Sequence, residues 1–206
     1  MVHYKLIYFP LRARAEIARQ IFAYAGQDYN EETVTFEQWP ALKSATPFGQ
    51  LPVLEVDGKQ LGQSYAIARY LAKEFGLAGQ NDFEEGEVDA IADQFKDYLN
   101  EIAPYMGALS GFKPGDVNQL RADVFVPGFQ KHFAFFENVL SANPSGFFVG
   151  DSLTWVDLLI SQHVQEVLEK DLAVVEEFRR ILAHRKKVQN DERIKAWIAR
   201  RPDYPF

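Results

Sequence analysis

The chain of 206 residues contains no cysteine. It can therefore form no disulfide, hold no metal through a thiolate and use no cysteine nucleophile. No run of about 18 apolar residues is present, so we expect no membrane-spanning segment. The first residues lead directly into a strand-like pattern at 3–9, without a basic and apolar leader, so we expect no secretory signal. Together these absences predict a cytoplasmic protein.

An excess of positive charge is also missing. The net charge is −7, and the first 80 residues contain 8 Lys and Arg against 8 Asp and Glu. The remainder contains 14 against 21 and carries the whole imbalance. Nucleic-acid binding needs a basic footprint, so we exclude that class. The hydrophobic fraction of 47% predicts a folded globular protein. The unequal charge of the two parts indicates two domains.

The first part alternates strand and helix patterns. Strands are predicted at 3–9 and 29–36, and a hairpin at 53–61, with helices at 11–25 and 64–75. A strand–helix–strand unit implies a parallel pair of strands, and the hairpin adds antiparallel ones. We therefore predict an α/β domain with a small mixed sheet over residues 1–76.

The second part has helix patterns only. After a polar linker at 77–83, helices are predicted at 84–109, 116–140, 154–168, 173–183 and 188–200. Pro127 should interrupt the second of these. Ser152-Leu153-Thr154 followed by Asp157 is close to a capping box and marks the start of the third. We predict an all-α domain over residues 84–206.

The segment 45–71 has the most specific pattern. Pro52 opens a strand, where a proline cannot donate to the ladder, and a cis bond before it would make a sharp corner. Asp57-Gly58 is a two-residue turn signal. Ser64 begins a helix, whose free N–H groups favour an anion. A free strand edge beside a helix N-terminus suits a small peptide with a carboxylate.

Taken as an ordered set, these motifs resemble the glutathione transferases. The set comprises Tyr8, Arg14, Trp39, Lys43, Gln50-Leu51-Pro52, Gln63-Ser64 and Asp97, with the capping motif at 152–157. The aromatic-rich start, Phe48-Gly49 and Asp97 are similar to the sigma class, which includes haematopoietic prostaglandin D synthases. The resemblance implies a thioredoxin-like N-terminal domain with a four-stranded mixed sheet, a helical C-terminal domain and a homodimer.

The resemblance also implies a chemistry, with glutathione as co-substrate. The thiolate of glutathione is its nucleophile. Tyr8 would donate a hydrogen bond that favours the thiolate, and Arg14 would add positive potential. Taken alone, Tyr8 is typical of a packed aromatic residue, and Arg14 of a structural ion pair.

The remaining motif residues would then bind the peptide. The Leu51 main chain, before a cis-Pro52, would pair with the cysteinyl residue. Gln63 and Ser64 would hold the γ-glutamyl carboxylate, and Asp97 of the partner subunit would meet its ammonium group. Trp39 and Lys43 would bracket the glycyl carboxylate, with Gln50 close by. Trp39 also fits a loop anchor, and Asp97 alone fits a solvated helix face.

The hydrophobic electrophile would lie over Tyr8. Its predicted walls are Phe9, Leu11, Leu99, Tyr105 and Phe206. Such apolar, varied side chains suit a wide pocket with few directional contacts. The four histidines are scattered, with no spacing typical of a metal site, so no metal is predicted. Ala13 stands where many relatives have glycine, which predicts a slightly altered turn after Tyr8.

These features predict a detoxification enzyme that conjugates glutathione to hydrophobic electrophiles or reduces organic hydroperoxides with it. Two alternatives remain. One is a glutathione-dependent prostaglandin D isomerase, which would use the same residues. The other is a non-catalytic ligandin or crystallin-like protein. A thioredoxin-type oxidoreductase is excluded, because it needs a reactive cysteine.

Overall fold

The computed structural model describes residues 2–205, which form two compact units. The first contains the described residues of 1–78 and 189–206, and the second contains residues 79–188. The C-terminal residues thus pack with the N-terminal ones. The predicted division into domains at 1–76 and 84–206 stays a prediction.

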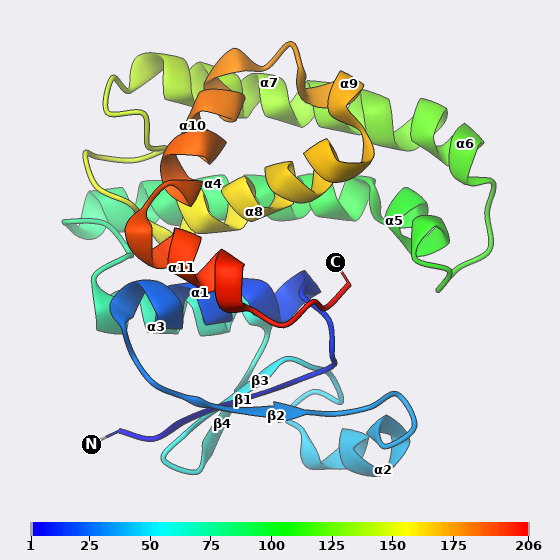
Figure 1. Ribbon diagram of the computed structural model, residues 1–206, viewed down its shortest axis with the longest axis vertical. Coiled ribbons are helices and arrows are strands. Elements are labelled where there is room, and N and C mark those ends of the chain that lie inside the picture. The colour runs from blue at the N-terminus through cyan, green and yellow to red at the C-terminus, as the bar shows by residue number, and fades with distance from the viewer. Residues whose placement is uncertain (1, 206) are drawn as a thin grey trace. The chain divides into compact units, whose positions relative to one another are not determined.

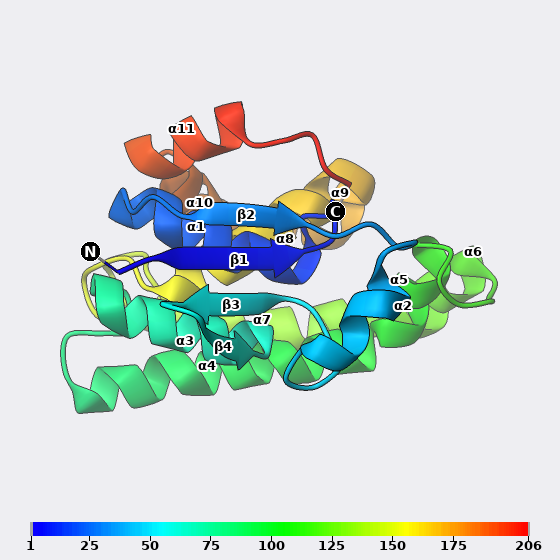
Figure 2. The same ribbon diagram turned by 90° about the horizontal axis from the view of Figure 1, so that it is seen from below.

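A mixed four-stranded sheet forms the centre of the first unit. Its order is β2-β1-β3-β4 (Figure 2), and the strands are β1 (Tyr4–Tyr8), β2 (Asn30–Thr33), β3 (Val53–Val56) and β4 (Lys59–Gly62). β1 pairs in parallel with β2 and antiparallel with β3. At the hairpin, Asp57 and Gly58 both have positive φ, as a two-residue turn requires. The predicted sheet is confirmed.

Helices α1 (Glu16–Ala25) and α3 (Ser64–Phe75) lie on the same face of this sheet (Figure 1). Their apolar stripes meet the strands in a core that contains Leu6, Ile21, Phe22, Leu54, Ile67 and Leu71. The bounds of α3 match the prediction. The helix predicted at 11–25 begins later, because a turn and a short 3₁₀ segment (Ala13–Ala15) precede α1. Helix α11 (Glu192–Arg200) packs against α1.

Two short segments separate β2 from β3. Helix α2 (Trp39–Leu42) leads into a 3₁₀ turn (Lys43–Ala45), and the chain then reaches the Leu51–Pro52 bond. That bond is cis, as the resemblance implied. The ladder of β3 begins directly after it, at Val53.

The second unit is entirely helical in the described residues. Its elements are α4 (Asp82–Glu101), α5 (Ala103–Leu109), α6 (Val117–Leu120), a π-helical turn (Arg121–Phe125), α7 (Val126–Ala142), α8 (Trp155–Lys170), α9 (Leu172–Val175) and α10 (Arg179–Gln189). Helices α4 and α8 lie side by side, and α7 packs on α4 (Figure 1). An aromatic core with Phe95, Tyr98, Phe129, Phe133 and Phe136 joins them.

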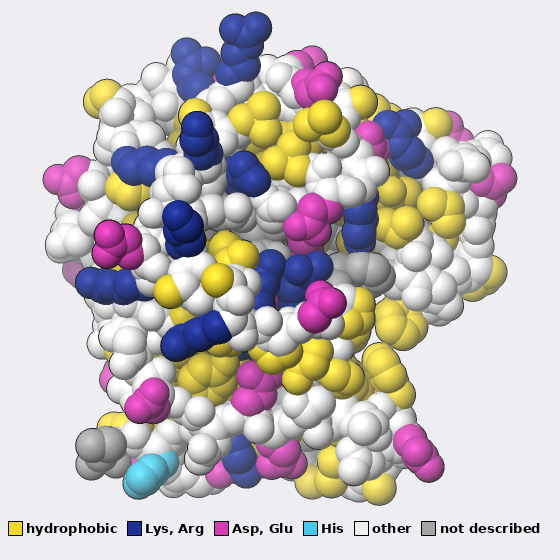
Figure 3. Space-filling model, in the orientation of Figure 1, with side chains coloured by type: hydrophobic (Ala, Val, Ile, Leu, Met, Phe, Trp, Pro, Cys, Tyr) yellow, Lys and Arg dark blue, Asp and Glu magenta, His cyan; other side chains and the backbone are white. Residues whose placement is uncertain are grey.

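The helix predicted at 84–109 is two helices, α4 and α5, and two further helix expectations need correction. The helix predicted at 116–140 is interrupted, as Pro127 predicted. The π-helical turn lies just before Pro127, which has no N–H and clashes with the preceding turn. The helix predicted at 173–183 is two helices, α9 and α10. Helix α10 continues through the basic residues 185–187, which lie in the gap between the helices predicted at 173–183 and 188–200. Figure 3 shows lysine and arginine side chains gathered over α10.

Candidate active site

Tyr8 ends β1 and is almost completely buried, with 5% of its surface exposed. Its hydroxyl accepts a hydrogen bond from the Arg14 backbone N–H at 3.4 Å. Burial raises the pKa of the phenol, whereas the Arg14 amide and the charges of Arg14 and Arg19 act in the opposite direction. The net direction is upward, so Tyr8 stays protonated at neutral pH. It can therefore donate a hydrogen bond to an anion.

The turn after β1 brings Arg14 back to Tyr8. The Leu11 N–H donates to the Phe9 carbonyl at 2.7 Å, and Ala13 has a φ of +30°. This is a left-handed backbone conformation that an alanine adopts only at a cost. Glycine would fit it without strain. The Arg14 side chain is exposed.

Gln63, predicted to bind the γ-glutamyl carboxylate, lies next to Gln50, which was predicted to lie near the glycyl carboxylate. Gln63 Nε2 donates to Gln50 Oε1 at 3.1 Å. Gln63 has a φ of +74° and precedes Ser64, the first residue of α3. A strained backbone at this position is typical of a binding site. The 12-residue helix α3 directs its free N–H groups toward this corner.

The predicted glycyl-carboxylate residues lie on the segment that joins β2 to β3. The Trp39 ring meets the Phe9 ring edge-on, with centroids 5.7 Å apart. The Lys43 side chain runs past Gly49, where an added Cβ would lie 3.4 Å from Lys43 Cε. Leu51 is partly exposed before Pro52. This segment therefore carries both predicted carboxylate-binding side chains.

The other predicted residues lie in the helical unit or outside the described chain. Asp97 is exposed on α4, and Leu99 is partly exposed two residues later. Phe9 and Leu11 belong to the first unit. Phe206 lies outside the described residues. The site residues as a set stay a prediction.

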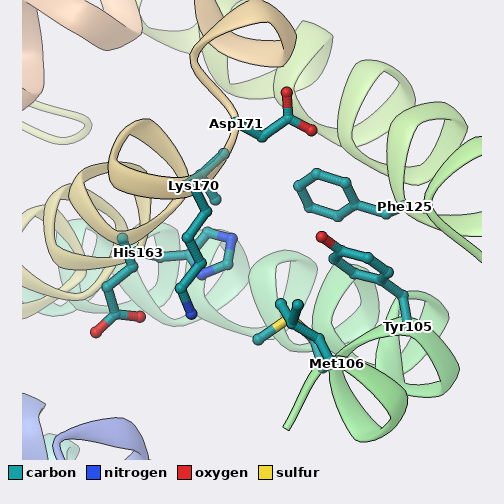
Figure 4. A pocket seen from close by; sticks show the side chains of 9 residues that line it. Tyr105, Met106, Phe125, His163, Lys170 and Asp171 are labelled. Carbon is teal, nitrogen blue, oxygen red and sulfur yellow. The ribbon is translucent and has the colours of Figure 1, made fainter. Parts of the chain in front are cut away.

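Tyr105 lines a small apolar pocket within the helical unit (Figure 4). Its ring stacks on Phe125 with centroids 4.6 Å apart. His163 stands across the pocket from these rings, and Asp171 lies at its edge, paired with Arg121 at 2.5 Å. Burial raises the pKa of Tyr105. The predicted electrophile wall Tyr105 is therefore part of a pocket.

Two buried residues, His163 at the pocket and Arg19 beside Tyr8, were not among the site residues predicted from the sequence. His163 is hydrogen-bonded to the Tyr98 hydroxyl at 3.0 Å, and burial lowers the pKa of His163 to about 3. Arg19 lies over the Tyr8 ring, with Cζ 5.9 Å from the ring centroid. The sequence offered one indication that these two residues are buried: each is a polar residue at a position on the apolar face of its helix.

In residues 2–205, no group of three or more histidine, aspartate and glutamate side chains could hold a metal ion. Within the same residues, no helix is long and apolar enough to cross a membrane.

Family models match two stretches of the chain. Residues 4–73 match the glutathione S-transferase N-terminal domain, and residues 102–201 match the C-terminal domain. A curated relative, the probable glutathione S-transferase 6 of Caenorhabditis elegans, is 77% identical over the whole of both chains. The chain belongs to the glutathione S-transferase family. It is an enzyme of that family, and the predicted thioredoxin-like and helical domains are confirmed.

Solved structures of the family agree. A monomeric glutathione S-transferase of the hookworm Necator americanus is 48% identical with a TM-score of 0.97, over 99% of this chain and 100% of that one. A Nu-class enzyme of Haemonchus contortus is 50% identical with a TM-score of 0.92, over 100% of both. A prostaglandin D synthase of Nilaparvata lugens is 34% identical with a TM-score of 0.86, over 97% and 98%.

Proposed function

We propose that the chain activates the thiol of glutathione as a thiolate and adds it to hydrophobic electrophiles. The observation that carries the proposal is the Tyr8 phenol, which is buried and protonated and accepts the Arg14 N–H. Because its oxygen is the acceptor in that bond, its own proton is free to donate to sulfur. Lowering the thiol pKa by about two units requires about 2.7 kcal/mol of preferential thiolate stabilisation.

The chemistry then needs little else from the protein. The thiol proton leaves to solvent, and Tyr8 keeps its own proton while it stabilises the sulfur anion. The sulfur forms a bond to the electrophilic carbon, and the leaving group departs with its electron pair. With an organic hydroperoxide, the thiolate attacks oxygen to release an alcohol and a glutathione sulfenic acid. A second glutathione condenses with that acid to give the disulfide and water.

Glutathione would lie along the corner that begins at the cis bond. We place its cysteinyl residue against the Leu51 main chain, and its γ-glutamyl carboxylate at Gln63 and Ser64. The Gln50–Gln63 bond and the α3 N-terminus support this placement. Trp39 and Lys43 would bracket the glycyl carboxylate. In this proposal residues 1–76 bind glutathione and residues 84–206 contribute the walls for the electrophile.

The proposal includes a homodimer in which Asp97 of the partner subunit meets the γ-glutamyl ammonium group. Asp97 is exposed and thus accessible to a second copy. Phe48, four residues before Pro52, has 65% of its surface exposed, and aromatic residues are enriched in interfaces relative to the rest of the surface. The hookworm relative is described as monomeric. The homodimer is therefore tested by measuring the molecular mass of this protein in solution. The proposal also includes a cytoplasmic location, where glutathione is kept reduced.

A second candidate activity is isomerisation of a prostaglandin endoperoxide. The similarity to the prostaglandin D synthase of Nilaparvata lugens favours it, and it would use the same thiolate. The sigma class is proposed on the same ground and on the motifs. The alternative class is Nu, because the chain is more similar to the Nu-class enzyme of Haemonchus contortus than to the prostaglandin D synthase.

The deciding experiment compares the wild type with Tyr8→Phe, which removes only the hydroxyl. We expect glutathione-dependent turnover of a chloronitrobenzene to fall by about 10–100-fold at neutral pH, with glutathione still bound. Tyr24→Phe is the control, at a tyrosine in α1 outside the predicted site. Equal turnover by wild type and Tyr8→Phe would contradict the proposed activation. Glutathione binding without turnover by the wild type would favour a ligandin or an isomerase.

A further inference from the structure

Arg19 is a charged residue that α1 buries beside the proposed catalytic phenol. Only 1% of its side chain is exposed, and its guanidinium lies over the rings of Tyr8 and Tyr204. A buried cation is tolerated only when its N–H groups are paired. The partners of Arg19 therefore indicate what it holds in place.

One edge of the guanidinium is bound to the turn that follows β1. Nη1 donates to the Leu11 carbonyl at 2.8 Å and to the Arg12 carbonyl at 3.4 Å. The turn continues through Ala13, with its φ of +30°, to the Arg14 N–H that reaches Tyr8. A strained conformation persists only when the surrounding structure determines it. The two bonds from Arg19 do so immediately before the strained residue.

The other edge is bound to the Glu31 carboxylate, and a second carboxylate, that of Glu16, lies beside Nη1. Nε and Nη2 donate to Glu31 Oε1 at 2.9 and 2.6 Å, and Nη1 lies 3.5 Å from Glu16 Oε2. Together with the carbonyl bonds, these contacts fix the orientation of the planar guanidinium. Its Cζ is thereby held over the Tyr8 ring, 5.9 Å from the ring centroid.

The C-terminal residues close the arrangement. Glu16 is buried, and its Oε1 accepts hydrogen bonds from Trp197 Nε1 at 2.9 Å and Arg201 Nη1 at 2.8 Å. The Pro205 carbonyl accepts the Arg12 N–H at 2.9 Å. The C-terminal segment is thus tied both to the carboxylate beside Arg19 and to the turn itself.

We propose that Arg19 is a positioning residue for the transferase reaction, which holds the Tyr8 ring and the Arg14 amide in register through the turn at 11–14. Glu16 and the residues from Trp197 onward keep Arg19 in place. The proposal rests on the role given above to Tyr8, and goes beyond it because Arg19 was not among the site residues. Arg19 acts through Tyr8 and is assigned no contact with substrate.

The charges around the phenol set the direction of the effect. Arg14 and Arg19 are the two cations that lower the pKa of Tyr8 against the effect of burial. Glu16 and Glu31 pair with Arg19 and weaken its positive potential at the phenol. Arg201 pairs with Glu16 and offsets part of that effect. Without Arg19, the phenol would be a weaker donor in a looser position. The pKa of the bound thiol should then rise.

The experiment compares Arg19→Met with Arg193→Met, a matched control. Arg193 also donates to a backbone carbonyl, that of Tyr24 at 2.9 Å, and also lies over a tyrosine ring. The pKa of the thiol of bound glutathione is measured from the ultraviolet absorbance of the thiolate, and glutathione affinity by calorimetry. For Arg19→Met we expect a rise of about one unit and about a tenfold loss of kcat/KM at neutral pH. We expect that variant to bind the protonated thiol form, measured at a pH well below the thiol pKa, with unchanged affinity, and we expect no change in either quantity for Arg193→Met.

A double-mutant cycle separates positioning from general destabilisation. In a Tyr8→Phe background, Arg19→Met should raise the thiol pKa no further, because its effect passes through the phenol. The proposal is overturned by an equal rise in that background, or by a folded Arg19→Met with an unchanged thiol pKa. If Arg19→Met does not fold, the thiol pKa is measured in Arg19→Lys. Lysine keeps the positive charge but lacks the planar guanidinium that makes several hydrogen bonds at once. A smaller rise supports the proposal, and no rise overturns it.

Failure of the thiol activation itself has a different signature. In that case Tyr8→Phe leaves the thiol pKa of the otherwise wild-type protein unchanged. The role of Arg19 is then tested in the ligand-free protein by ultraviolet titration of its tyrosines. Subtracting the titration of the Tyr8→Phe variant from that of the same protein with Tyr8, in the wild-type and Arg19→Met backgrounds, gives the ionisation of Tyr8 in each. An upward shift of the phenol ionisation in Arg19→Met supports the positioning role, and its absence overturns that role independently of glutathione.

Discussion

The Arg14 backbone N–H donates to the hydroxyl of Tyr8, which lies six positions earlier in the chain, before the turn. A hydroxyl that accepts such a bond keeps its proton for another partner. Because the donor is a main-chain group, the path of the turn and not the Arg14 side chain determines this geometry. The identity of the residues in the turn therefore bears directly on the proposed activity.

Ala13→Gly should stabilise the protein. Ala13 has a φ of +30°, and replacement by glycine at a left-handed position removes about 1 kcal/mol of steric cost. We expect a higher free energy of unfolding in urea with turnover retained, because Arg19 still holds the turn. Ala66→Gly, inside α3, is the control and should lose about 1 kcal/mol. A loss of stability in Ala13→Gly would show that its conformation is unstrained.

Asp97→Asn should weaken glutathione binding if a second subunit completes the site. Loss of one charge-assisted hydrogen bond costs about 1.5–3 kcal/mol, so Kd should rise about tenfold or more. Calorimetry measures it, and Asp93→Asn, one turn earlier on α4, is the control. The same Kd in both variants would remove Asp97 from the site. Light scattering on the wild type tests the dimer separately.

Thr154→Ala should destabilise the helical unit. The Thr154 N–H and hydroxyl both donate to Asp157 Oδ2, at 2.8 and 2.7 Å, and Asp157 is fully buried. Loss of an N-cap costs about 1–2 kcal/mol, which lowers Tm by about 2–8 °C in a chain of this size. Ser44→Ala, at an exposed serine, is the control. An unchanged Tm would mean that the remaining Asp157 partners suffice.

His163→Gln should flatten the loss of stability in acid. The pKa of His163 is about 3 in the folded protein, whereas that of an unfolded histidine is near 6.5. The unfolded chain therefore binds more protons over this window, and stability falls as pH drops from 6.5 toward 3. The slope is up to about 1.4 kcal/mol per pH unit. Urea unfolding at several pH values measures it, with His3→Gln, at an exposed histidine, as the control. Identical slopes in wild type and His163→Gln would contradict this assignment.

Sequence patterns predicted the elements whose signals are local. Helix α3 starts and ends at the predicted residues, since Gln63-Ser64 and Gly76 delimit it. The capping motif at Thr154 forms as predicted. The phenylalanines of α7 form its core, with the exception of Phe135, which is half exposed. A periodic pattern identifies a buried face but not each member of it.

The remainder depended on contacts between distant residues. Arg19 and Glu16 occupy the buried side of α1, yet their partners lie at Glu31 and in α11. A charged residue in a helix is ordinarily exposed, and no local signal distinguishes a buried pair. The break between α9 and α10 was missed because α10 is rich in charged residues and has a weak apolar stripe.

The bond between Arg12 and Pro205 has a practical consequence for anyone who makes this protein. A purification tag fused after residue 206 would begin two positions beyond the Pro205 carbonyl, which is bonded to the turn beside Tyr8. Such a fusion would pull on the same turn that presents the Arg14 amide. Recombinant protein for kinetic work should therefore carry its tag at the other terminus, or have a C-terminal tag removed before assay.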